Sequence, residues 1–244
     1  MILEVCIDSV ESAIAAQEGG AARVELCADL EHGGTTPIVN VIRAVRERVS
    51  IPLHVMIRPR PGDFCYTDQE FGTMERDIEE AKRLKVDGVV FGLLTERGEV
   101  DVIRTRRFLE LARPLSVTFH RAFDETGDLL RAIDDVKVIG VDRVLTSGGK
   151  GDILRNAELL AELVRRSDGR PIIMAGGGVN FENVSELVKR SEVKEVHTLS
   201  AVLKDGPLIS RSSNRSSSSR NVVDPAKVRR MVRLLGDLSL RSQS

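Results

Sequence analysis

The sequence is poor in aromatic side chains. Its 244 residues include no tryptophan, one tyrosine and seven phenylalanines. A surface that binds single-stranded nucleic acid needs aromatic side chains on which the bases stack. Basic side chains are not in excess either, because 36 Lys and Arg residues face 37 Asp and Glu residues, for a net charge of −1. Nucleic-acid-binding domains normally carry a marked basic excess, so we expect no nucleic-acid partner.

Cysteine and long apolar runs are also scarce. Three cysteines do not make a disulfide framework. The N-terminus lacks the charged-then-apolar layout of a signal peptide, and no apolar run approaches the ~18–20 residues of a membrane span. We therefore expect a cytoplasmic protein without a membrane partner. Hydrophobic residues make up 41% of the chain, which is enough for one sizeable core.

Short β-type runs alternate with longer segments whose apolar residues recur three and four positions apart. The predicted strands are Ile2–Cys6, Arg23–Cys27, Leu53–Arg58, Gly88–Gly92, Leu115–His120, Arg143–Ser147, Ile172–Ala175 and Glu195–Thr198. The predicted helices between them are Ser9–Glu18, Val39–Val49, Asp68–Leu84, Val102–Ala112, Leu129–Ile139, Ile153–Arg166 and Phe181–Arg190. Asp128 and Asp152 are candidate N-caps. This alternation predicts the α/β class and a single (β/α)8 TIM-barrel-like domain over residues 1–244.

A two-unit repeat supports the barrel. Pro52, Pro114 and Pro171 introduce the third, fifth and seventh predicted strands, a position at which a missing N–H is tolerated. Odd and even strands of a (β/α)8 barrel contribute to different interior layers. This agrees with prolines that introduce only odd-numbered predicted strands. An open doubly wound sheet is the alternative, but Cys6-Ile7-Asp8-Ser9 stands where its glycine-rich fingerprint would follow the first strand.

The last unit is irregular. Residues 206–224 are rich in serine and arginine and cannot bury enough apolar surface to order themselves. We predict a disordered insertion there, and a phosphorylated Ser/Arg segment is the alternative. Pro225 then begins a final helix, because proline suits the first helical position. Its predicted buried stripe is Val228, Met231, Val232 and Leu235.

Polar side chains share one face of several predicted strands. Because strand side chains alternate, Glu4, Glu25, Arg58, His120 and His197 should project into the barrel while their apolar neighbours pack on the helices. Inward charge is costly unless it is paired or functional. A buried ion network is one interpretation. An active site is the other, in which Glu4, Glu25 and His120 would supply acid–base chemistry.

Two cysteines end neighbouring strands. Cys6 and Cys27 close the first and second predicted strands, and adjacent strands lie ~4.8 Å apart. Thiolate and thioether ligands favour Cu(I), so the pair is a candidate copper site to which Met56 could add a thioether. Cysteines that merely fill buried space are the alternative, and strand spacing would also tolerate a disulfide. Cys65 lies in a predicted loop and is interpreted as incidental.

A glycine-rich loop follows the seventh predicted strand. Backbone N–H groups of Gly176-Gly177-Gly178 could hold an anion, since barrel phosphate sites favour the loops after strands seven and eight. Arg58, Ser147 and His197 are the side chains predicted to help bind a small anionic ligand. A tight turn that requires positive φ is the alternative interpretation.

Several motifs resemble those of a known family. They are Leu3-Glu4-Val5-Cys6, Glu25-Leu26-Cys27, Gly33-Gly34-Thr35-Thr36-Pro37, Val55-Met56-Ile57-Arg58-Pro59-Arg60-Pro61-Gly62-Asp63-Phe64, Thr118-Phe119-His120-Arg121-Ala122-Phe123-Asp124 and Leu145-Thr146-Ser147-Gly148. In these motifs the sequence resembles the copper homeostasis protein CutC family, over roughly Ile2 to Ala201. It departs from the family pattern at Thr198-Leu199-Ser200-Ala201, which is one residue longer, and in the Arg/Ser-rich stretch.

The resemblance implies a TIM-barrel-like fold, a cytoplasmic homo-oligomer and copper handling through Cu(I), with Cys6 and Cys27 at the positions of the family's proposed ligands. Two functions follow as hypotheses. The first is copper homeostasis, in which the cysteine pair binds Cu(I) for cytoplasmic buffering or trafficking. The second is a TIM-barrel enzyme that acts on a small anionic or phosphorylated substrate. The fold by itself does not decide between them.

Overall fold

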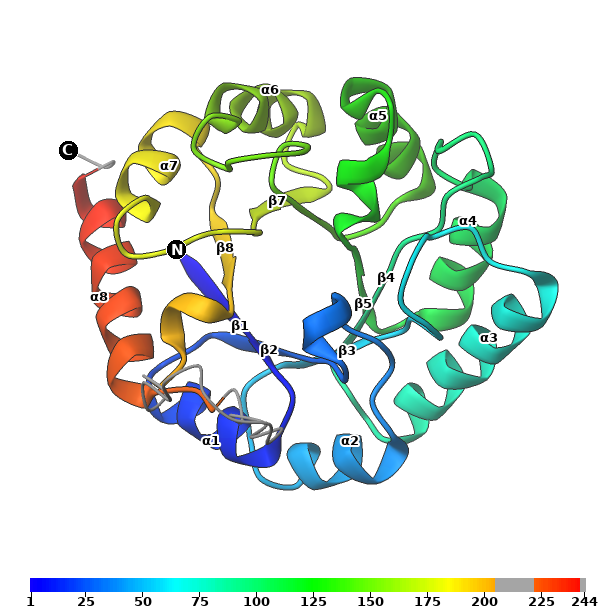
Figure 1. Cartoon of the computed structure of the whole chain (residues 1–244), viewed down its shortest axis with the longest axis horizontal. Helices are drawn as coiled ribbons and strands as arrows, with labels where there is room; N and C mark the ends of the chain where they lie inside the picture. Colours follow the sequence, from blue (N-terminus) through cyan, green and yellow to red (C-terminus); the bar gives the residue numbers. More distant parts are fainter. Residues whose placement is uncertain (205–221, 242–244) are drawn as a thin grey trace, which may run out of the picture.

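Eight parallel strands close into a barrel in the computed structural model, which describes residues 1–204 and 222–241 (Figure 1). The strands are β1 (Ile2–Ile7), β2 (Arg23–Leu26), β3 (Leu53–Met56), β4 (Gly88–Phe91), β5 (Ser116–Phe119), β6 (Arg143–Thr146), β7 (Ile172–Ala175) and β8 (Glu195–Thr198). Each strand pairs with the next along the chain, and β8 pairs with β1. The (β/α)8 barrel predicted from the sequence is confirmed.

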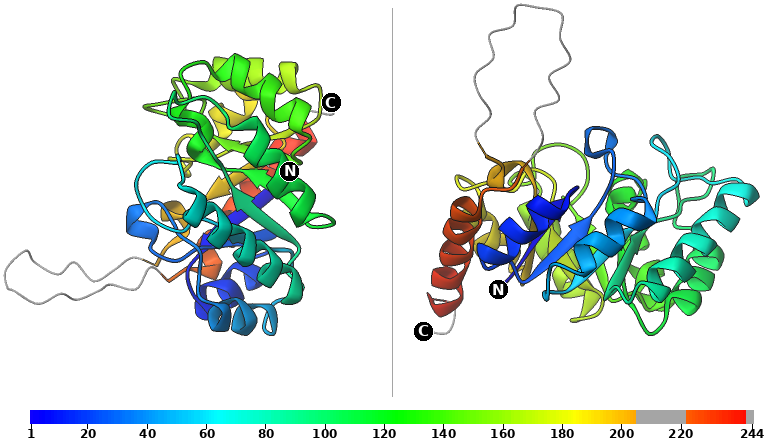
Figure 2. Two further views of the ribbon diagram at one scale, coloured as in Figure 1. Left: turned by 90° about the vertical axis from the view of Figure 1, so that its right-hand side faces the viewer. Right: turned by 90° about the horizontal axis from the view of Figure 1, so that it is seen from below.

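Helices surround the strands on all sides (Figures 1 and 2). They are α1 (Val10–Glu18), α2 (Val39–Arg46), α3 (Asp68–Arg83), α4 (Val102–Ala112), α5 (Leu129–Ile139), α6 (Ala157–Ser167), α7 (Val184–Ser191) and α8 (Pro225–Arg241). The last helix packs against α1 and α7. Of its predicted stripe, Val228, Met231 and Leu235 are buried and Val232 is partly buried.

Short polar side chains set where the helices begin. Asp128 accepts hydrogen bonds from the N–H groups of Leu130 and Arg131 at the start of α5, as predicted. The prediction for Asp152 was wrong, because α6 begins only at Ala157. Asp152 makes the same kind of contact, with the N–H groups at positions 154 and 155, but it caps a turn in the loop after β6.

The barrel has an apolar outer face and a polar interior. Strand residues such as Val5, Val24, Val55 and Val89 are fully buried between the sheet and the helices. The predicted inward set is buried as well, since Glu4, Glu25, Arg58 and His120 are each at most 4% exposed. Alternation along each strand therefore separates a hydrophobic layer, which stabilises the fold, from an interior that holds charged side chains.

The eighth unit departs from the regular pattern. A short 3₁₀ helix, Ser200–Val202, follows β8, and Leu203 then forms an antiparallel bridge with Val223. Residues 203 and 223, on either side of the segment that is not described, therefore lie next to each other. Of the predicted insertion at 206–224, residues 206–221 lie outside the described residues.

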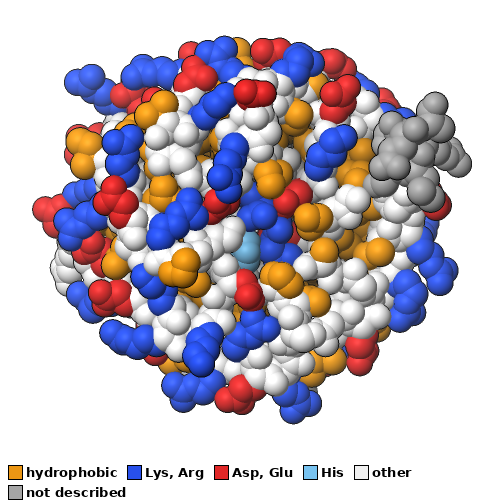
Figure 3. Space-filling view, turned by 180° about the vertical axis from the view of Figure 1, so that it is seen from behind, with side chains coloured by type: hydrophobic (Ala, Val, Ile, Leu, Met, Phe, Trp, Pro, Cys, Tyr) orange, Lys and Arg blue, Asp and Glu red, His pale blue; other side chains and the backbone are white. Residues whose placement is uncertain are grey.

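The outer surface carries charges of both signs. Seen from behind, Lys and Arg side chains are interspersed with Asp and Glu over the whole visible face (Figure 3). No helix within residues 1–204 and 222–241 combines the length and apolarity that a membrane span would need.

Candidate metal centre and the cavity above it

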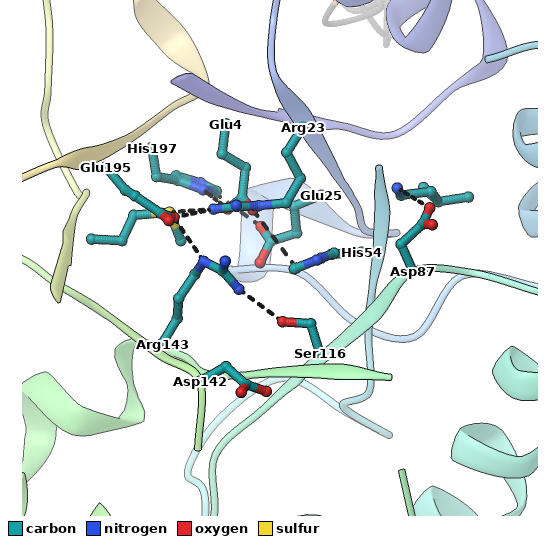
Figure 4. A network of polar contacts seen from close by, with 12 residues as sticks. Glu4, Arg23, Glu25, His54, Asp87, Ser116, Asp142, Arg143, Glu195 and His197 are labelled. Atoms are coloured by element: carbon teal, nitrogen blue, oxygen red, sulfur yellow. Dashed lines mark hydrogen bonds and ion pairs between the residues drawn. The ribbon is translucent and has the colours of Figure 1, made fainter. Parts of the chain in front are cut away.

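A ring of buried ion pairs occupies one level of the barrel interior (Figure 4). Arg23 on β2 pairs with Glu4 on β1 and, at 2.6 Å, with Glu195 on β8. Arg143 on β6 reaches past β7, so that its Nε lies 2.7 Å from the same Glu195 carboxylate, and its terminal nitrogen donates to Ser116 Oγ at 2.8 Å. The predicted alternative of a buried ion network is therefore present at this level.

The network keeps Glu4 ionised. Burial on its own raises the pKa of Glu4, but the Arg23 guanidinium and the His197 imidazole more than offset burial and hold that pKa well below its usual range. Paired carboxylates and guanidiniums can be buried because each partner replaces the lost water of the other. The sequence placed Glu4 inward but did not predict the role of Arg143, which pairs with a residue 52 positions away.

The two predicted metal ligands lie together above this network. Glu25 is the register partner of Cys6 across β1 and β2, and Cys27 follows the end of β2. The Sγ atoms of Cys6 and Cys27 are 3.8 Å apart, and both side chains are buried with Met56 and Val90 in a small apolar cluster. All three cysteines of the chain lie in its described part, and none forms a disulfide.

The Glu25 carboxylate borders the thiols, and the His197 imidazole lies beside that carboxylate. Glu25 Oε2 lies 3.6 Å from Cys27 Sγ and 3.8 Å from His197 Nε2. The other imidazole nitrogen, Nδ1, is 2.8 Å from Glu4 Oε1. Glu25 Oε1 is buried and contacts no hydrogen-bonding group among the described residues. Such a buried, unpaired oxygen costs free energy unless a ligand satisfies it.

The thiols and their neighbours titrate as one unit. The hydrogen bond from Cys27 stabilises a Cys6 thiolate and, against the opposing effect of burial, lowers the pKa of Cys6 to about 6, with help from His197. The same contact, together with burial, raises the pKa of Cys27 well above its usual range. Burial raises the pKa of Glu25. Burial lowers that of His197, but Glu25, Cys6 and Glu4 outweigh burial and raise it.

A cavity of about 400 Å³ opens above the thiols at the C-terminal ends of the strands, which is where TIM-barrel active sites lie. Eight of the residues predicted to form a site line it: Cys6, Glu25, Cys27, Arg58, His120, Gly177, Gly178 and His197. Glu4, Ser147 and Gly176 are not among the lining residues. The cavity is much larger than a metal ion requires.

Two side chains of the predicted anion site already make hydrogen bonds within the protein. Arg58 donates to the backbone carbonyls of His32, Gly34 and Gly62, and its Nε is buried with no partner in the described chain. Ser147 Oγ lies within hydrogen-bonding distance of Asp124 Oδ2, at 2.8 Å, and of Gly149 O, at 2.7 Å, so its one proton is donated within the protein. These two side chains therefore position loops, and the anion site stays a prediction that centres on the remaining groups.

The glycine loop serves both as a tight turn and as a cavity wall. The N–H of Gly176 donates to Thr146 O at 3.0 Å. Gly177 and Gly178 have φ of +89° and +99°, which favours glycine. A Cβ on Gly177 would lie 2.7 Å from the guanidinium carbon of Arg121. Arg121, which the sequence did not single out, thus forms the wall facing this loop.

Asp124 is a second residue that the sequence did not single out. Its buried carboxylate accepts hydrogen bonds from the Thr146 and Ser147 hydroxyls and from the N–H groups of Ser147 and Gly149, and it pairs with Arg121 at 2.8 Å. It therefore joins the loop after β5 to the loop after β6. Its place as the last residue of the Thr118–Asp124 motif was the signal available in the sequence.

His120 is held as a neutral imidazole. Its Nδ1 accepts a hydrogen bond from the N–H of Ala122, its Nε2 is buried without a partner in the described residues, and its ring lies 5.0 Å from that of Phe64. Burial, supported by the nearby Arg58 charge, lowers the pKa of His120 to about 3.

This lowered pKa makes stability depend on pH. Below pH 6.5 the unfolded chain binds a proton at His120 that the folded protein rejects until about pH 3, so stability falls as the pH falls. We expect His120→Asn to reduce the loss of unfolding free energy between pH 7 and pH 5 by about 2 kcal/mol. Urea unfolding at both pH values measures this. His32→Asn, at an exposed position, should not reduce the loss, and equal losses in wild type and His120→Asn would contradict the prediction.

Comparisons with known proteins show the family to which the chain belongs. The family model described as "CutC family" matches residues 1–202. The chain belongs to the CutC family. It is 41% identical to the copper homeostasis protein cutC homolog of Mus musculus, over 97% of this chain and 90% of the relative. It is 42% identical to the human homolog, over 93% of this chain and 86% of the relative.

Solved structures show the same relationship. The crystal structure of a CutC protein from Streptococcus agalactiae is similar, with a TM-score of 0.76 and 34% identity, and the match covers 81% of this family member and 97% of that chain. Thiamine phosphate pyrophosphorylase from Pyrococcus furiosus is more distant, with a TM-score of 0.63 and 16% identity over 97% of this chain and 96% of that one. The second likeness reflects the shared barrel fold alone.

Proposed function

We propose that this protein acts in copper homeostasis by binding Cu(I) through Cys6 and Cys27, for cytoplasmic buffering or trafficking. The observation that carries the proposal is the 3.8 Å separation of the two sulfur atoms at the base of the cavity. One ion can bridge two sulfurs at that distance, since two metal–sulfur bonds of about 2.3 Å span more than this. Thiolates select Cu(I) over hard cations.

The rigid barrel supports tight binding. Both cysteines are fixed by neighbouring strands and buried beside Met56, so little conformational entropy is lost when an ion arrives. The names of the mouse and human relatives associate this family with copper homeostasis, which supports the choice of cargo.

A Cu(I) competition titration with a chromophoric chelator tests the proposal. Cys6→Ser or Cys27→Ser should weaken binding by at least about 100-fold, because each removes one of two thiolates. Cys65→Ser is the matched control and should bind like the wild type, since that partly exposed residue lies outside the cavity lining. Equal affinities for the wild type and the Cys6→Ser/Cys27→Ser double variant would remove copper from the proposed function.

That outcome would favour the second candidate, an enzyme that acts on a small anionic or phosphorylated substrate. The size of the cavity and its unpartnered buried groups support this candidate, because Glu25 Oε1 and His120 Nε2 both belong to residues that line it. Glu4, in contrast, is committed to Arg23 and His197 below the cavity floor. An acid–base role would therefore fall to Glu25 and His120.

A further inference from the structure

The thiols belong to a larger set of metal-binding side chains. Two groups of three residues have ligand atoms that lie within 4.8 Å of one another, namely Cys6, Glu25 and Cys27, and Glu4, Glu25 and His197. Glu25 is common to both groups. Glu4 is already paired with Arg23, which leaves the two thiols, the Glu25 carboxylate and the His197 imidazole as the available donors.

His197 is oriented as a ligand. Its Nδ1 lies 2.8 Å from the Glu4 carboxylate, which Arg23 keeps ionised, so Nδ1 carries the proton of that hydrogen bond. Nε2 then faces Glu25 at 3.8 Å, and Glu25 in turn contacts Cys27 Sγ at 3.6 Å. A histidine that binds a metal usually donates its other ring N–H to a carboxylate in this way.

Glu25 adds a hard donor to the site. Its Oε2 is 3.6 Å from Cys27 Sγ, and its buried Oε1 has no hydrogen-bond partner in the part of the chain that the structure describes. Carboxylate oxygen is a poor ligand for Cu(I), which prefers soft donors, whereas Zn²⁺ accepts cysteine, histidine and carboxylate together. The mixture of donors therefore fits a borderline divalent cation better than a purely soft one.

The charges of the side chains around the site also favour a divalent cation. In the network below, two carboxylates, Glu4 and Glu195, face two guanidiniums, Arg23 and Arg143, so it offers no surplus positive charge. A metal bound by Cys6 and Cys27 as thiolates and by the Glu25 carboxylate would meet three negative charges, of which a divalent cation offsets two and Cu⁺ offsets one. Uncompensated charge in a buried site is costly.

We propose that Cys6, Cys27, Glu25 and His197 form a Zn²⁺ site. All four residues line the cavity, and four protein ligands would complete the tetrahedral coordination that Zn²⁺ prefers. The site shares its thiols with the proposed copper function but does not depend on it, because Glu25 and His197 distinguish the two metals.

The experiment measures Zn²⁺ and Cu(I) affinities in parallel by chelator competition for the wild type, Glu25→Gln, His197→Gln and Cys65→Ser. Removing Glu25 or His197 as a ligand should lower Zn²⁺ affinity by at least about 10–100-fold, while the Cu(I) affinity should change by less than about threefold because both thiols remain. Cys65→Ser should leave both affinities unchanged. Thermal unfolding of each variant shows whether it folds.

The wild type provides an independent measurement. Co²⁺ in place of Zn²⁺ should give the intense visible absorption of a four-coordinate ion together with a thiolate-to-cobalt charge-transfer band. Equal Zn²⁺ affinities in the wild type and both variants would overturn the site, as would a Co²⁺ spectrum without the thiolate band. Loss of both Zn²⁺ and Cu(I) binding in a folded Glu25→Gln variant would also overturn the proposed zinc site, because it would show that Glu25 is a copper ligand. Failure to bind Cu(I) with intact Zn²⁺ binding would reject only the copper function.

Discussion

Replacing Arg23 with methionine should lower the free energy of unfolding by about 3–5 kcal/mol, which is the usual cost of removing one partner from a buried ion pair. Arg23 contacts Glu4 and Glu195, and both carboxylates are at most 2% exposed. Without the guanidinium, Glu4 loses its principal positive partner in a space that water does not reach. Methionine fills a similar volume, so the loss would report charge rather than a cavity.

The matched control is Arg166→Met. Arg166, like Arg23, makes two hydrogen bonds to carboxylate oxygens. Both of these oxygens belong to Asp134, at 2.8 and 2.6 Å, and the two side chains are 42% and 48% exposed. Exposed pairs of this kind contribute less than about 1 kcal/mol. Urea unfolding at pH 7 compares the two variants. Similar losses in both would show that the interior network is far more hydrated than its burial indicates.

Gly19→Ala should be destabilising although alanine is the better helix former. Gly19 follows α1, and a Cβ at this position would lie 2.4 Å from Val228 Cβ and 2.9 Å from Pro225 O, both in α8. Neither atom is the far end of a flexible side chain, so α8 itself would have to move. Overpacking of this kind costs about 1–3 kcal/mol, and each kcal/mol lowers the melting temperature by about 2–4 °C in a protein of this size.

Gly236→Ala is the control within the same helix. A Cβ at Gly236 would meet nothing within 4 Å, so the change should stabilise the protein by up to about 1 kcal/mol through helix propensity alone. Thermal unfolding of both variants should therefore show shifts of opposite sign. A melting temperature for Gly19→Ala at or above that of the wild type would contradict the close packing of α8 on α1.

Local patterns in the sequence were enough to predict the barrel and the floor of its cavity. Alternation of polar and apolar residues along each strand predicted that Glu4, Glu25 and His120 face inward, because the side-chain period of a strand is fixed by its backbone. The same reasoning placed Cys6 and Cys27 at the ends of neighbouring strands, and their sulfur atoms do lie together. These features depend only on residues close in sequence and on strand order.

Only the tertiary structure decided how the inward side chains are partnered. His197 meets Glu4 because closure of the barrel brings β8 against β1, and Arg143 on β6 meets Glu195 on β8 past the intervening strand β7. Arg58, predicted to bind an anion, donates to loop carbonyls that the sequence did not indicate. Loop conformations and contacts across the barrel depend on the shear and closure of all eight strands together, and no local pattern encodes them. The sequence by itself therefore determined which side chains enter the interior, and the closed barrel determined which of them are paired and which remain available to a ligand.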